Sequence, residues 1–436
     1  MLNLSHDQAA GWDAADPLAA LRDQFYLPND ANVHLYLDGN SLGLLSRPAE
    51  ASLLAALESW KTQAIAGWTH GAPAPWFSFA ETLAEKIAPL VGAHGPDEVI
   101  VSGTTTANLH QLLATLFRPA GLRTKIVTDA LNFPSDRYAL ASHLRLRGLD
   151  PADHLVVVPS RDGRTLREED LIEAMSAPDV VLAVFPSVLY ASGQLLDMER
   201  LTDCARRQGV LIGWDCSHSI GAVPHALSDW GADFAVWCHY KYLNAGPGAV
   251  GGLYVNRRHH AVNGGACAAP GLAGWFGSEK ARQFDMTDAL APAGDAGALQ
   301  IGTPSILGMA PLAGALELHH RAGIERLREK SLRLTAYLRA LVEARLSRFG
   351  VWVATPRANE RRGGHLALVH PDADRLCRAL RENGVVPDFR APDVIRLAPV
   401  PLYNRFVDCF DAVARLETIL VEKRHERLSA GREVVS

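Results

Sequence analysis

Short apolar runs alternate with helical patterns between about residues 98 and 255, and this alternation constrains the fold more than any other feature of the chain. The runs are DEVIVSG, TKIVTD, HLVVVPS, VVLAVFPS, GVLIGWD, DFAVWCH and AVGGLYV. Several of them are separated by helix-like segments such as RYALASHLRLRG, REEDLIEAM and DMERLTDCARRQG. Continuous runs rich in β-branched residues, alternating with helices, are typical of a mostly parallel sheet that is covered on both faces. The sequence therefore predicts an α/β fold.

The chain is expected to comprise three parts. Residues 1–48 form an N-terminal segment that packs near the functional site and the small domain, and residues 49–305 form the large domain. The large domain ends in a Gly- and Ala-rich stretch, and long irregular stretches of this kind are often functional or interfacial. Residues 306–436 combine helical segments with short strands such as VWVATP and HLALVHP, which indicates a smaller α+β domain.

Composition and charge argue against several classes of protein. The chain has 436 residues, of which 48% are hydrophobic and 21% charged, as in soluble globular proteins. A net charge of −5 without a basic run argues against a nucleic-acid-binding protein. No secretory signal is visible, and the apolar stretch VVLAVFPSVLY is too short to cross a membrane. The six cysteines form no CxxC pair, so we expect free thiols, no metal site and a cytoplasmic protein.

Polar residues close several of the predicted strands, and ligands of parallel sheets gather at the carboxyl ends of the strands. These residues are Ser102, Asp129, Ser187, Asp215 and Lys241. Strand ends also collect polar residues by default, so position alone does not identify a site. Lys241 is the least ordinary of them, because desolvating an ammonium group is costly unless a partner is present. Either its side chain extends to water, or the site needs an amine of lowered pKa for chemistry.

Asp215 and Lys241 together suit the cofactor pyridoxal 5'-phosphate (PLP). A lysine that binds PLP covalently needs an acidic partner for the pyridine nitrogen, so that the ring can act as an electron sink. Asp215 supplies that charge 26 residues before Lys241, and His218 can orient it or pack near the ring. The simpler alternative for Asp215 is a cap on the turn that follows it.

Two other segments offer contacts to a phosphate and to a flat ring. Three threonines in GTTTANLHQ, at 103–111, open a helical pattern after a strand, which gives either an ordinary N-cap or an anion site. Phe133 precedes a proline in LNFPSDRYAL and is therefore extended; it serves either packing or stacking on a cofactor ring. The chain has no GxxxxGK(S/T) loop and no GxGxxG turn after a strand, which disfavours an NAD-dependent dehydrogenase.

Two further motifs carry side chains that suit a substrate. Arg396 lies inside the apolar pattern VIRLAPVPLYN, where a guanidinium either clamps a carboxylate or forms an ion pair between domains. The segment GWTHGAPAPWF, at 67–77, concentrates aromatic residues that either form core or line a pocket for an aryl substrate. An acid, a lysine, a hydroxyl-rich helix start and a buried arginine together match PLP, with Lys241 as its anchor.

These motifs resemble those of the kynureninase family, which are fold-type-I PLP enzymes of the cysteine-desulfurase-like branch. The matching stretches are LYLDGNSLGLLSRP, TANLH, NFPSD, WDCSHSIGAVP, CHYKYLNAGPGAVGGLYV, GWFG and IRLAPVPLYN. They are spread over most of the chain in the family's order, and FPSD, YKYLNAGPG and RLAPVPLYN together are highly specific. The resemblance implies a large domain with a mostly parallel seven-stranded sheet and a smaller C-terminal α+β domain.

The resemblance also implies roles for individual residues. Lys241 is expected to hold PLP covalently, and Asp215 to pair with the pyridine nitrogen. The other implied cofactor contacts are Thr105, Thr106, Phe133, Asp136, Ser187, His218 and Tyr240, with Trp275 and Thr303 contributed by the second subunit of a homodimer. The implied substrate contacts are Arg396 for the α-carboxylate, and Ser41 and His70 for the aryl pocket.

The activity implied by the resemblance is hydrolysis of L-kynurenine, and of its 3-hydroxy form, to L-alanine and anthranilate or 3-hydroxyanthranilate. This reaction belongs to tryptophan catabolism through the kynurenine pathway and to NAD biosynthesis. Lys241 is expected to remove the α-proton, and Tyr240 is the candidate proton relay for the step that breaks the carbon–carbon bond. The alternatives are a cysteine desulfurase, a small aminotransferase or an inactive PLP-binding protein of the same fold. A desulfurase is disfavoured because residues 355–368, where its nucleophilic thiol is expected, contain no cysteine.

Overall fold

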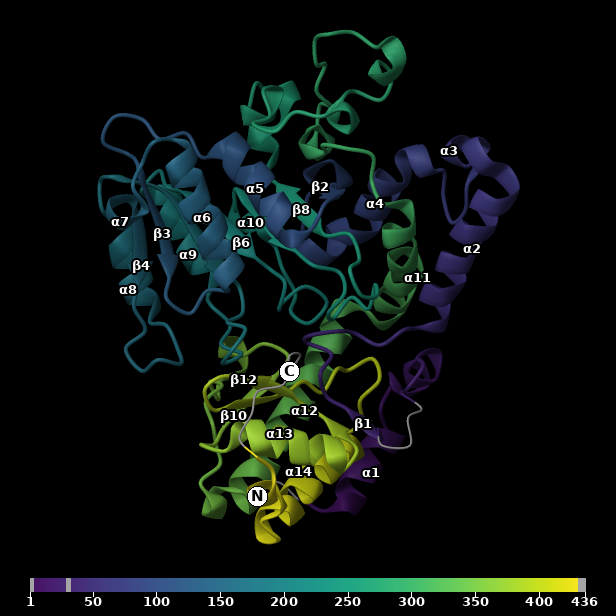
Figure 1. The fold of residues 1–436 in the computed structure, drawn as a ribbon, viewed down its shortest axis with the longest axis vertical. Helices are drawn as coiled ribbons and strands as arrows, with labels where there is room; N and C mark the ends of the chain where they lie inside the picture. Colours follow the sequence, from purple (N-terminus) through teal and green to yellow (C-terminus); the bar gives the residue numbers. More distant parts are fainter. Residues whose placement is uncertain (1–3, 29–32, 430–436) are drawn as a thin grey trace.

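The seven apolar runs form one sheet in the structure, a computed structural model that describes residues 4–28 and 33–429 (Figure 1). The strands lie in the order β2-β8-β7-β6-β5-β3-β4. Their bounds are β2 Val99–Val101, β3 Lys125–Asp129, β4 Leu155–Val158, β5 Val180–Pro186, β6 Leu211–Asp215, β7 Phe234–Trp237 and β8 Gly252–Val255. Only β8 among these seven strands runs against the others, antiparallel to both β2 and β7. The prediction of a mostly parallel sheet is confirmed.

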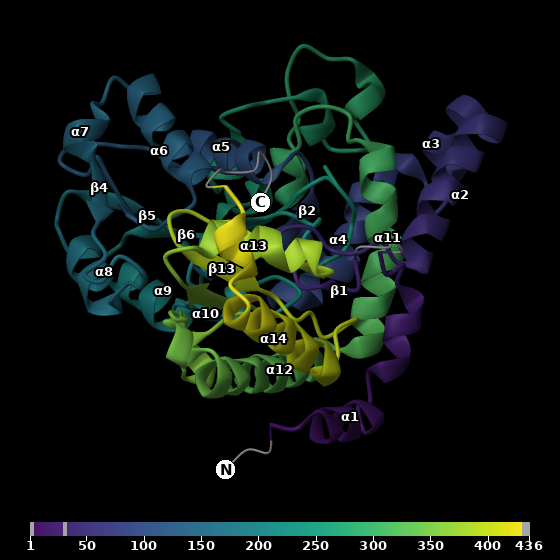
Figure 2. The same ribbon diagram turned by 60° about the horizontal axis from the view of Figure 1, so that its bottom comes forward.

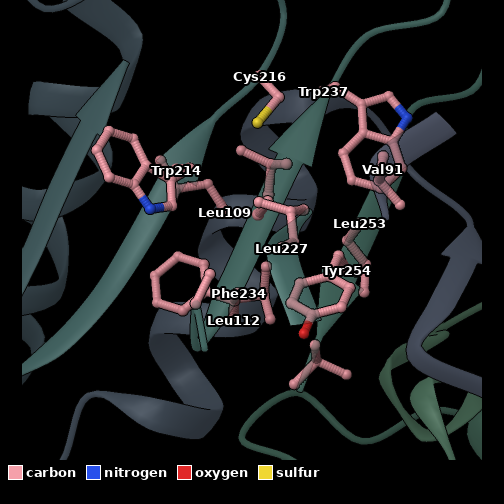
Figure 3. Packing of buried hydrophobic residues seen from close by; sticks show 14 of the residues in the cluster. Val91, Leu109, Leu112, Trp214, Cys216, Leu227, Phe234, Trp237, Leu253 and Tyr254 are labelled. Carbon is pink, nitrogen blue, oxygen red and sulfur yellow. The ribbon is translucent and has the colours of Figure 1, made fainter. Parts of the chain in front are cut away.

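Helices pack against this sheet and complete its core. They are α4 Phe79–Val91, α5 Thr105–Leu116, α6 Pro134–Leu146, α7 Pro151–His154, α8 Glu168–Met175, α9 Met198–Arg207 and α10 Leu227–Trp230. Figure 3 shows part of this core, where Leu109 and Leu112 of α5 lie among sheet residues that include Trp214 and Phe234. Strands β5 and β6 are buried along almost their whole length. Burial on both faces explains why their sequences read as continuous apolar runs and do not alternate with polar residues.

Helices α2 (Arg47–Gln63) and α11 (Ile306–Ala322) pack side by side at the edge of the large sheet (Figure 1). They approach closely at Gly314, where a Cβ atom would overlap the carbonyl oxygen of Pro48. Most of the buried hydrophobic residues of α11 belong to the same core as the large sheet. This helix therefore fixes α2 to the large domain.

The helical sequence that follows the Gly- and Ala-rich stretch forms two helices. Gly323 has a φ of +77°, which ends α11 and begins α12 (Ile324–Arg345). The second hydrophobic core of the molecule takes up residues of α12 from Leu334 onward. We propose that the boundary between the large domain and the C-terminal domain lies near residue 305, and that α11 connects the two.

The C-terminal part contains a four-stranded antiparallel sheet in the order β12-β13-β10-β9. Its elements are α12, β9 Trp352–Val353, β10 Leu366–Val369, α13 Ala373–Glu382, β12 Asp388–Arg390, β13 Val394–Leu397 and α14 Phe406–Val421, which Figure 2 shows from below. The start of the chain is attached to this part, because α1 (His6–Ala14) packs against α14. In addition, β1 (Leu35–Tyr36) pairs in parallel with β11 (Val385–Val386).

The Gly- and Ala-rich stretch between β8 and α11 folds into short 3₁₀ turns and projects from the top of the molecule in Figure 1. These turns are η5 Arg257–His259, η6 Ala261–Asn263, η7 Ala266–Ala268, η8 Trp275–Gly277, η9 Gln283–Asp285 and η10 Ala296–Leu299. The remaining short helices are η1 Ala19–Gln24, η2 Ala64–Ala66, α3 Gly67–His70, η3 Trp76–Ser78, η4 Pro96–Glu98, η11 Ser347–Phe349, η12 Asn359–Arg361 and η13 Arg424–Arg427. The six cysteines are free, as predicted. Among the described helices, none has the length and apolar character needed to cross a membrane.

Candidate active site

A cavity of about 210 Å³ lies where the carboxyl ends of the large sheet meet the C-terminal part of the chain. Strand ends contribute Asp215 and Lys241, and the starts of α5 and α6 contribute threonines, Phe133 and Asp136. The C-terminal sheet contributes two arginines, and the loop after β1 contributes Asn40 and Ser41. Segments that are far apart in the sequence therefore surround one cavity.

Lys241 follows β7 in a tight turn and is only half-buried, and its amine is held by a histidine. The Nζ atom lies 3.0 Å from Nε2 of His218, which is buried. Burial lowers the pKa of His218 well below its usual 6.5, and the positive charge of Lys241 lowers it further. The imidazole is therefore neutral at neutral pH and accepts a hydrogen bond from the amine. This contact explains how a lysine is accommodated at the end of a buried strand.

Two buried carboxylates lie side by side: Asp215 at the end of β6 and Asp136 at the start of α6. An Oδ atom of Asp215 accepts a hydrogen bond from the backbone N–H of Ser217 at 2.8 Å. Burial raises the pKa of Asp136 well above its usual value, and the neighbouring charge of Asp215 raises it further. Burial and the neighbouring carboxylate therefore favour the protonated form of Asp136.

The start of α5 lies at the cavity. The N-cap is Thr104, whose Oγ1 accepts the backbone N–H of Ala107 at 3.3 Å. Thr105 and Thr106, the next two residues, line the cavity. Their hydroxyls and the N–H groups of the first turn form the kind of site that binds a phosphate group.

Arg396 lies in β13 and is almost completely buried. Its guanidinium donates to the carbonyl oxygen of Tyr190 at 2.7 Å and to Oγ of Ser41 at 3.0 Å, and it pairs with the carboxylate of Asp388. Ser41 in turn donates to Asp388 at 3.0 Å. Burial lowers the pKa of Arg396 to about 10, so the side chain stays charged at neutral pH. Arg396 therefore forms an ion pair with Asp388 and also lines the cavity.

Comparison with known proteins identifies the family. The kynureninase C-terminal domain matches residues 327–416 of this chain. Kynureninase from Geobacillus thermodenitrificans is 54% identical over 424 residues, which cover 97% of this chain and 96% of that protein. Kynureninase from Bacillus cereus is 52% identical over 432 residues, which cover 99% of this chain and 98% of that protein. The chain belongs to the kynureninase family.

The chain is also similar in fold to solved structures of C-DES and of a cysteine desulfurase. A C-DES mutant with glycine covalently linked to its PLP cofactor has a TM-score of 0.75 and 20% identity, over 91% of this chain and 98% of that one. A cysteine desulfurase from Thermococcus onnurineus has a TM-score of 0.75 and 17% identity, over 92% and 98%. At such low identity the likeness concerns the fold, and it confirms the predicted fold class.

Most of the site residues predicted from the sequence line the cavity. They are Ser41, Thr105, Thr106, Phe133, Asp136, Asp215, His218, Tyr240, Lys241 and Arg396. Ser187 lies one layer behind, where its hydroxyl donates to the carbonyl oxygen of Asp215 at 2.9 Å and contacts Ser219 at 2.7 Å. In this position Ser187 holds the backbone of Asp215.

Three predicted residues lie outside the cavity in the single chain. His70 ends α3 on the surface, with its Nδ1 2.7 Å from the hydroxyl of Thr69. Trp275 is 43% exposed in the projecting stretch and donates to the carbonyl oxygen of Gln283 at 3.0 Å. Thr303 lines a different cavity, on the side of the α5 start that includes Gly103. The aryl-pocket role of His70 stays a prediction, as do the cofactor contacts of Trp275 and Thr303, which require a second subunit.

The sequence analysis did not select several residues that line the cavity. Arg390 lies in β12 beside β13 and pairs with Asp388 at 3.2 Å. Tyr190 follows β5, and its ring meets that of Phe133 edge-on with centroids 5.4 Å apart. Asn40 belongs to the motif LYLDGNSLG, which was matched to the family without a role for its asparagine. The sequence contained a signal for Arg390, because this arginine lies in a short strand only six residues before Arg396.

The residues around the cavity fit PLP. Lys241 offers a primary amine for the aldehyde, Asp215 offers a negative charge for the ring nitrogen, and the α5 start suits the phosphate. Among the described residues, Nδ1 of His218 and one carboxyl oxygen of Asp136 are buried without a hydrogen-bond partner. Buried polar atoms of this kind are typically satisfied by a ligand or by water.

Proposed function

We propose that this protein binds PLP through Lys241 and hydrolyses L-kynurenine, with the residues of this cavity in the roles described below. The observation that carries the proposal is that Lys241, Asp215 and Arg396 line one cavity although they come from the turn after β7, the end of β6 and the separate strand β13. A covalent anchor, a charge for the ring nitrogen and a carboxylate clamp are the three requirements of PLP chemistry on an amino acid.

The first task of the protein is to orient the substrate. Arg396 binds the α-carboxylate, because a guanidinium can donate two parallel hydrogen bonds to a carboxylate. When bound, PLP withdraws electrons from the substrate's α-carbon through its protonated ring, and Asp215 keeps the ring nitrogen protonated. Lys241 takes the α-proton, and neutral His218 positions its amine by accepting a hydrogen bond.

The second task is to break the carbon–carbon bond next to the ketone. Water adds to the ketone carbon, the bond between the β- and γ-carbons breaks, the β-carbon receives a proton, and the ammonium of Lys241 returns a proton to the α-carbon. The products are anthranilate and L-alanine. Tyr240 is the proposed proton relay, because it lines the cavity and burial raises the pKa of its phenol above the usual 10, so it keeps its proton until one is needed. We extend the proposal to 3-hydroxykynurenine, and place the reaction in tryptophan catabolism and NAD biosynthesis.

We further propose that the enzyme is a homodimer whose sites are shared. Large apolar side chains are exposed near the helices α2 and α3 and in the projecting stretch; they include Trp60 at 60%, Ile65 at 79%, Phe284 at 66% and Met286 at 75%. Clustered exposure of this kind is typical of interaction surfaces. A second subunit at this surface would bring Trp275 and Thr303 to the neighbouring cavity. The free cysteines favour a reducing compartment, the cytoplasm.

A direct assay tests the reaction and the anchor together. The wild-type protein, supplied with PLP and L-kynurenine, should absorb visible light and release anthranilate and L-alanine. Lys241→Ala should lose the covalent cofactor spectrum and almost all turnover, because its amine is both anchor and base. Unchanged turnover in this variant would refute the assignment of Lys241.

A cysteine desulfurase of the same fold is the second candidate that the assay addresses. Such an enzyme needs a thiol at its active site, and the described residues that line the cavity include no cysteine. We therefore expect no sulfur release from L-cysteine. A yellow protein that releases sulfur and makes no anthranilate would overturn the proposed reaction and leave the cofactor in place.

A further inference from the structure

Asn40 carries a buried amide that nothing in the described chain satisfies. Its side chain is completely buried, and within residues 4–28 and 33–429 neither its Oδ1 nor its Nδ2 has a hydrogen-bond partner. It nevertheless lines the cavity that contains Lys241 and Arg396. Leaving a buried amide unpaired costs roughly 1–3 kcal/mol, so folded proteins rarely keep one without a reason.

The loop that carries Asn40 is held tightly on both sides of it. The backbone N–H groups of Ser41 and Leu42 both donate to the carbonyl oxygen of Asp38, at 3.0 and 3.1 Å. The N–H of Gly43 donates to the carbonyl oxygen of Tyr240 at 2.7 Å, which ties the loop to the turn of Lys241. A side chain at Gly39 or Gly43 would overlap neighbouring atoms, so the backbone has no room to shift. Asn40 is therefore presented to the cavity in a fixed position.

We infer that Asn40 is a further substrate-binding residue, whose Nδ2 donates a hydrogen bond to the α-carboxylate of the amino-acid substrate. The next residue, Ser41, is hydrogen-bonded to the guanidinium of Arg396 at 3.0 Å, so Asn40 lies beside the proposed carboxylate clamp. The inference deepens the proposed function and rests on it. It adds a neutral donor to a site that the sequence analysis assigned to Arg396.

The other ligand groups already have partners in this cavity. The amine of Lys241, the charge of Asp215 and the start of α5 meet the needs of the cofactor. The carboxylate has four lone-pair positions, and one guanidinium satisfies only part of them. Arg396 must also share its N–H groups with Asp388 and with Tyr190. A neutral donor next to this arginine completes the carboxylate site without adding a charge.

Binding of L-alanine and of L-alaninamide to the PLP-loaded enzyme tests this role. L-Alanine has the α-carboxylate and no ketone, and the amide has neither the charge nor the second oxygen. Asn40→Ala should weaken L-alanine binding about 10- to 100-fold, as expected for a hydrogen bond to a charged group, and leave L-alaninamide binding within about twofold. Asn40→Asp should weaken L-alanine binding at least as much, because it replaces the donor with a second negative charge. Calorimetry or the change in cofactor absorbance gives the dissociation constants.

Thermal unfolding of the ligand-free protein separates a binding role from a structural one. Asn404 is the matched control, since it is equally buried but its amide donates to the carbonyl oxygen of Tyr36 at 3.0 Å and accepts the N–H of Val400 at 2.8 Å. Asn404→Ala should lower the melting temperature by several degrees. Asn40→Ala should leave it unchanged or raise it, because it removes an unpaired amide.

Three outcomes would overturn the inference. The first is L-alanine binding by Asn40→Ala that equals the wild type while the KM for kynurenine rises, which would move the contact to the ketone. The second is a weakened affinity for PLP itself, and the third is a loss of stability as large as that of Asn404→Ala. Failure of the proposed function looks different, because the wild type would then produce no anthranilate.

Discussion

Two arginines that line the cavity share one buried carboxylate. Asp388 is fully buried and pairs with both Arg396 and Arg390. Breaking such a pair by removing one partner costs several kcal/mol, since a charge is then buried alone. A substrate carboxylate can bind here only by sharing guanidinium N–H groups with Asp388, and each arginine has five of them. The affinity for a substrate carboxylate therefore depends on how Arg390 and Arg396 divide their N–H groups between it and Asp388.

Arg390→Gln should raise the KM for kynurenine about tenfold or more and change kcat less than threefold. Arg390 lines the cavity and acts on a carboxylate that does not react, so its loss weakens substrate and transition state equally. Steady-state kinetics gives both constants. Arg164→Gln is the control, because Arg164 pairs with Asp393 at 2.6 Å outside the cavity, and its kinetics should match the wild type. A fall in kcat with an unchanged KM would contradict the assignment.

Asp129→Asn should stabilise the protein at neutral pH and much less at pH 4. Burial raises the pKa of Asp129 from 3.8 to about 7. The folded protein thus keeps a proton that the unfolded chain releases, and the wild type loses up to about 4 kcal/mol of stability as the pH rises from 4 to 7. Asparagine does not titrate, so the advantage of the variant should grow over this range and then stay constant.

Urea unfolding of both proteins at several pH values measures this difference. Asp179→Asn serves as the control, because Asp179 forms an ion pair with Lys125 at 2.7 Å and its pKa is lowered chiefly by that contact. This control should bring no gain at neutral pH. An advantage of Asp129→Asn that does not vary with pH would show that the charge is not the cause.

At the scale of elements, the close packing of α11 on α2 fixes the position of α2, which carries exposed apolar residues such as Trp60. Gly314 lies at the contact, where a Cβ atom would overlap the carbonyl oxygen of Pro48 and lie 2.7 Å from the backbone nitrogen of Ala49. Backbone atoms cannot turn aside as a flexible side chain can. The spacing of these two helices therefore depends on the missing side chain.

Gly314→Ala should destabilise the protein by about 1–3 kcal/mol or more, because the helices must separate to admit the methyl group. The same substitution in α1, Gly11→Ala, meets no atom within 4 Å and should stabilise the protein by about 0.5–1 kcal/mol through helix propensity. Denaturant unfolding compares the two variants. Equal effects on stability would exclude close packing as the reason for glycine at 314.

At the scale of the whole molecule, two residues predicted for the site lie outside the cavity of their own chain. Thr303 and the exposed Trp275 both lie outside the cavity that contains Lys241. A two-fold dimer repeats each contact on both subunits, so residues that are remote in one chain can complete the site of the other. The proposed dimer gives these two residues a role.

Co-expression of Lys241→Ala with Trp275→Ala should restore activity that neither variant has alone. Half of the dimers would contain both chains, each with one complete site, so the mixture should reach up to about a quarter of wild-type turnover. Light scattering should show a dimer in each preparation. Activity equal to the average of the two separate variants would place Trp275 in its own chain's site or in none.

The sequence by itself determined the sheet and the strand-end residues of this protein. Continuous apolar runs reflect burial on both faces, and parallel strands bring their carboxyl ends to one edge, so Asp215 and Lys241 had to lie near each other. The antiparallel direction of β8 left no mark in its sequence, because a fully buried strand reads the same either way.

Only the tertiary structure decided which side chains share the cavity. Asn40 and Arg390 come from opposite ends of the chain, and both line the cavity because β1 of the N-terminal segment pairs with β11 of the C-terminal part. The sequence likewise did not show which of three adjacent threonines caps α5. In the structure Thr104 is the N-cap, so that Thr105 and Thr106 line the cavity. Periodicity records the local burial of each element. It does not record which elements pack together, and that packing makes the site.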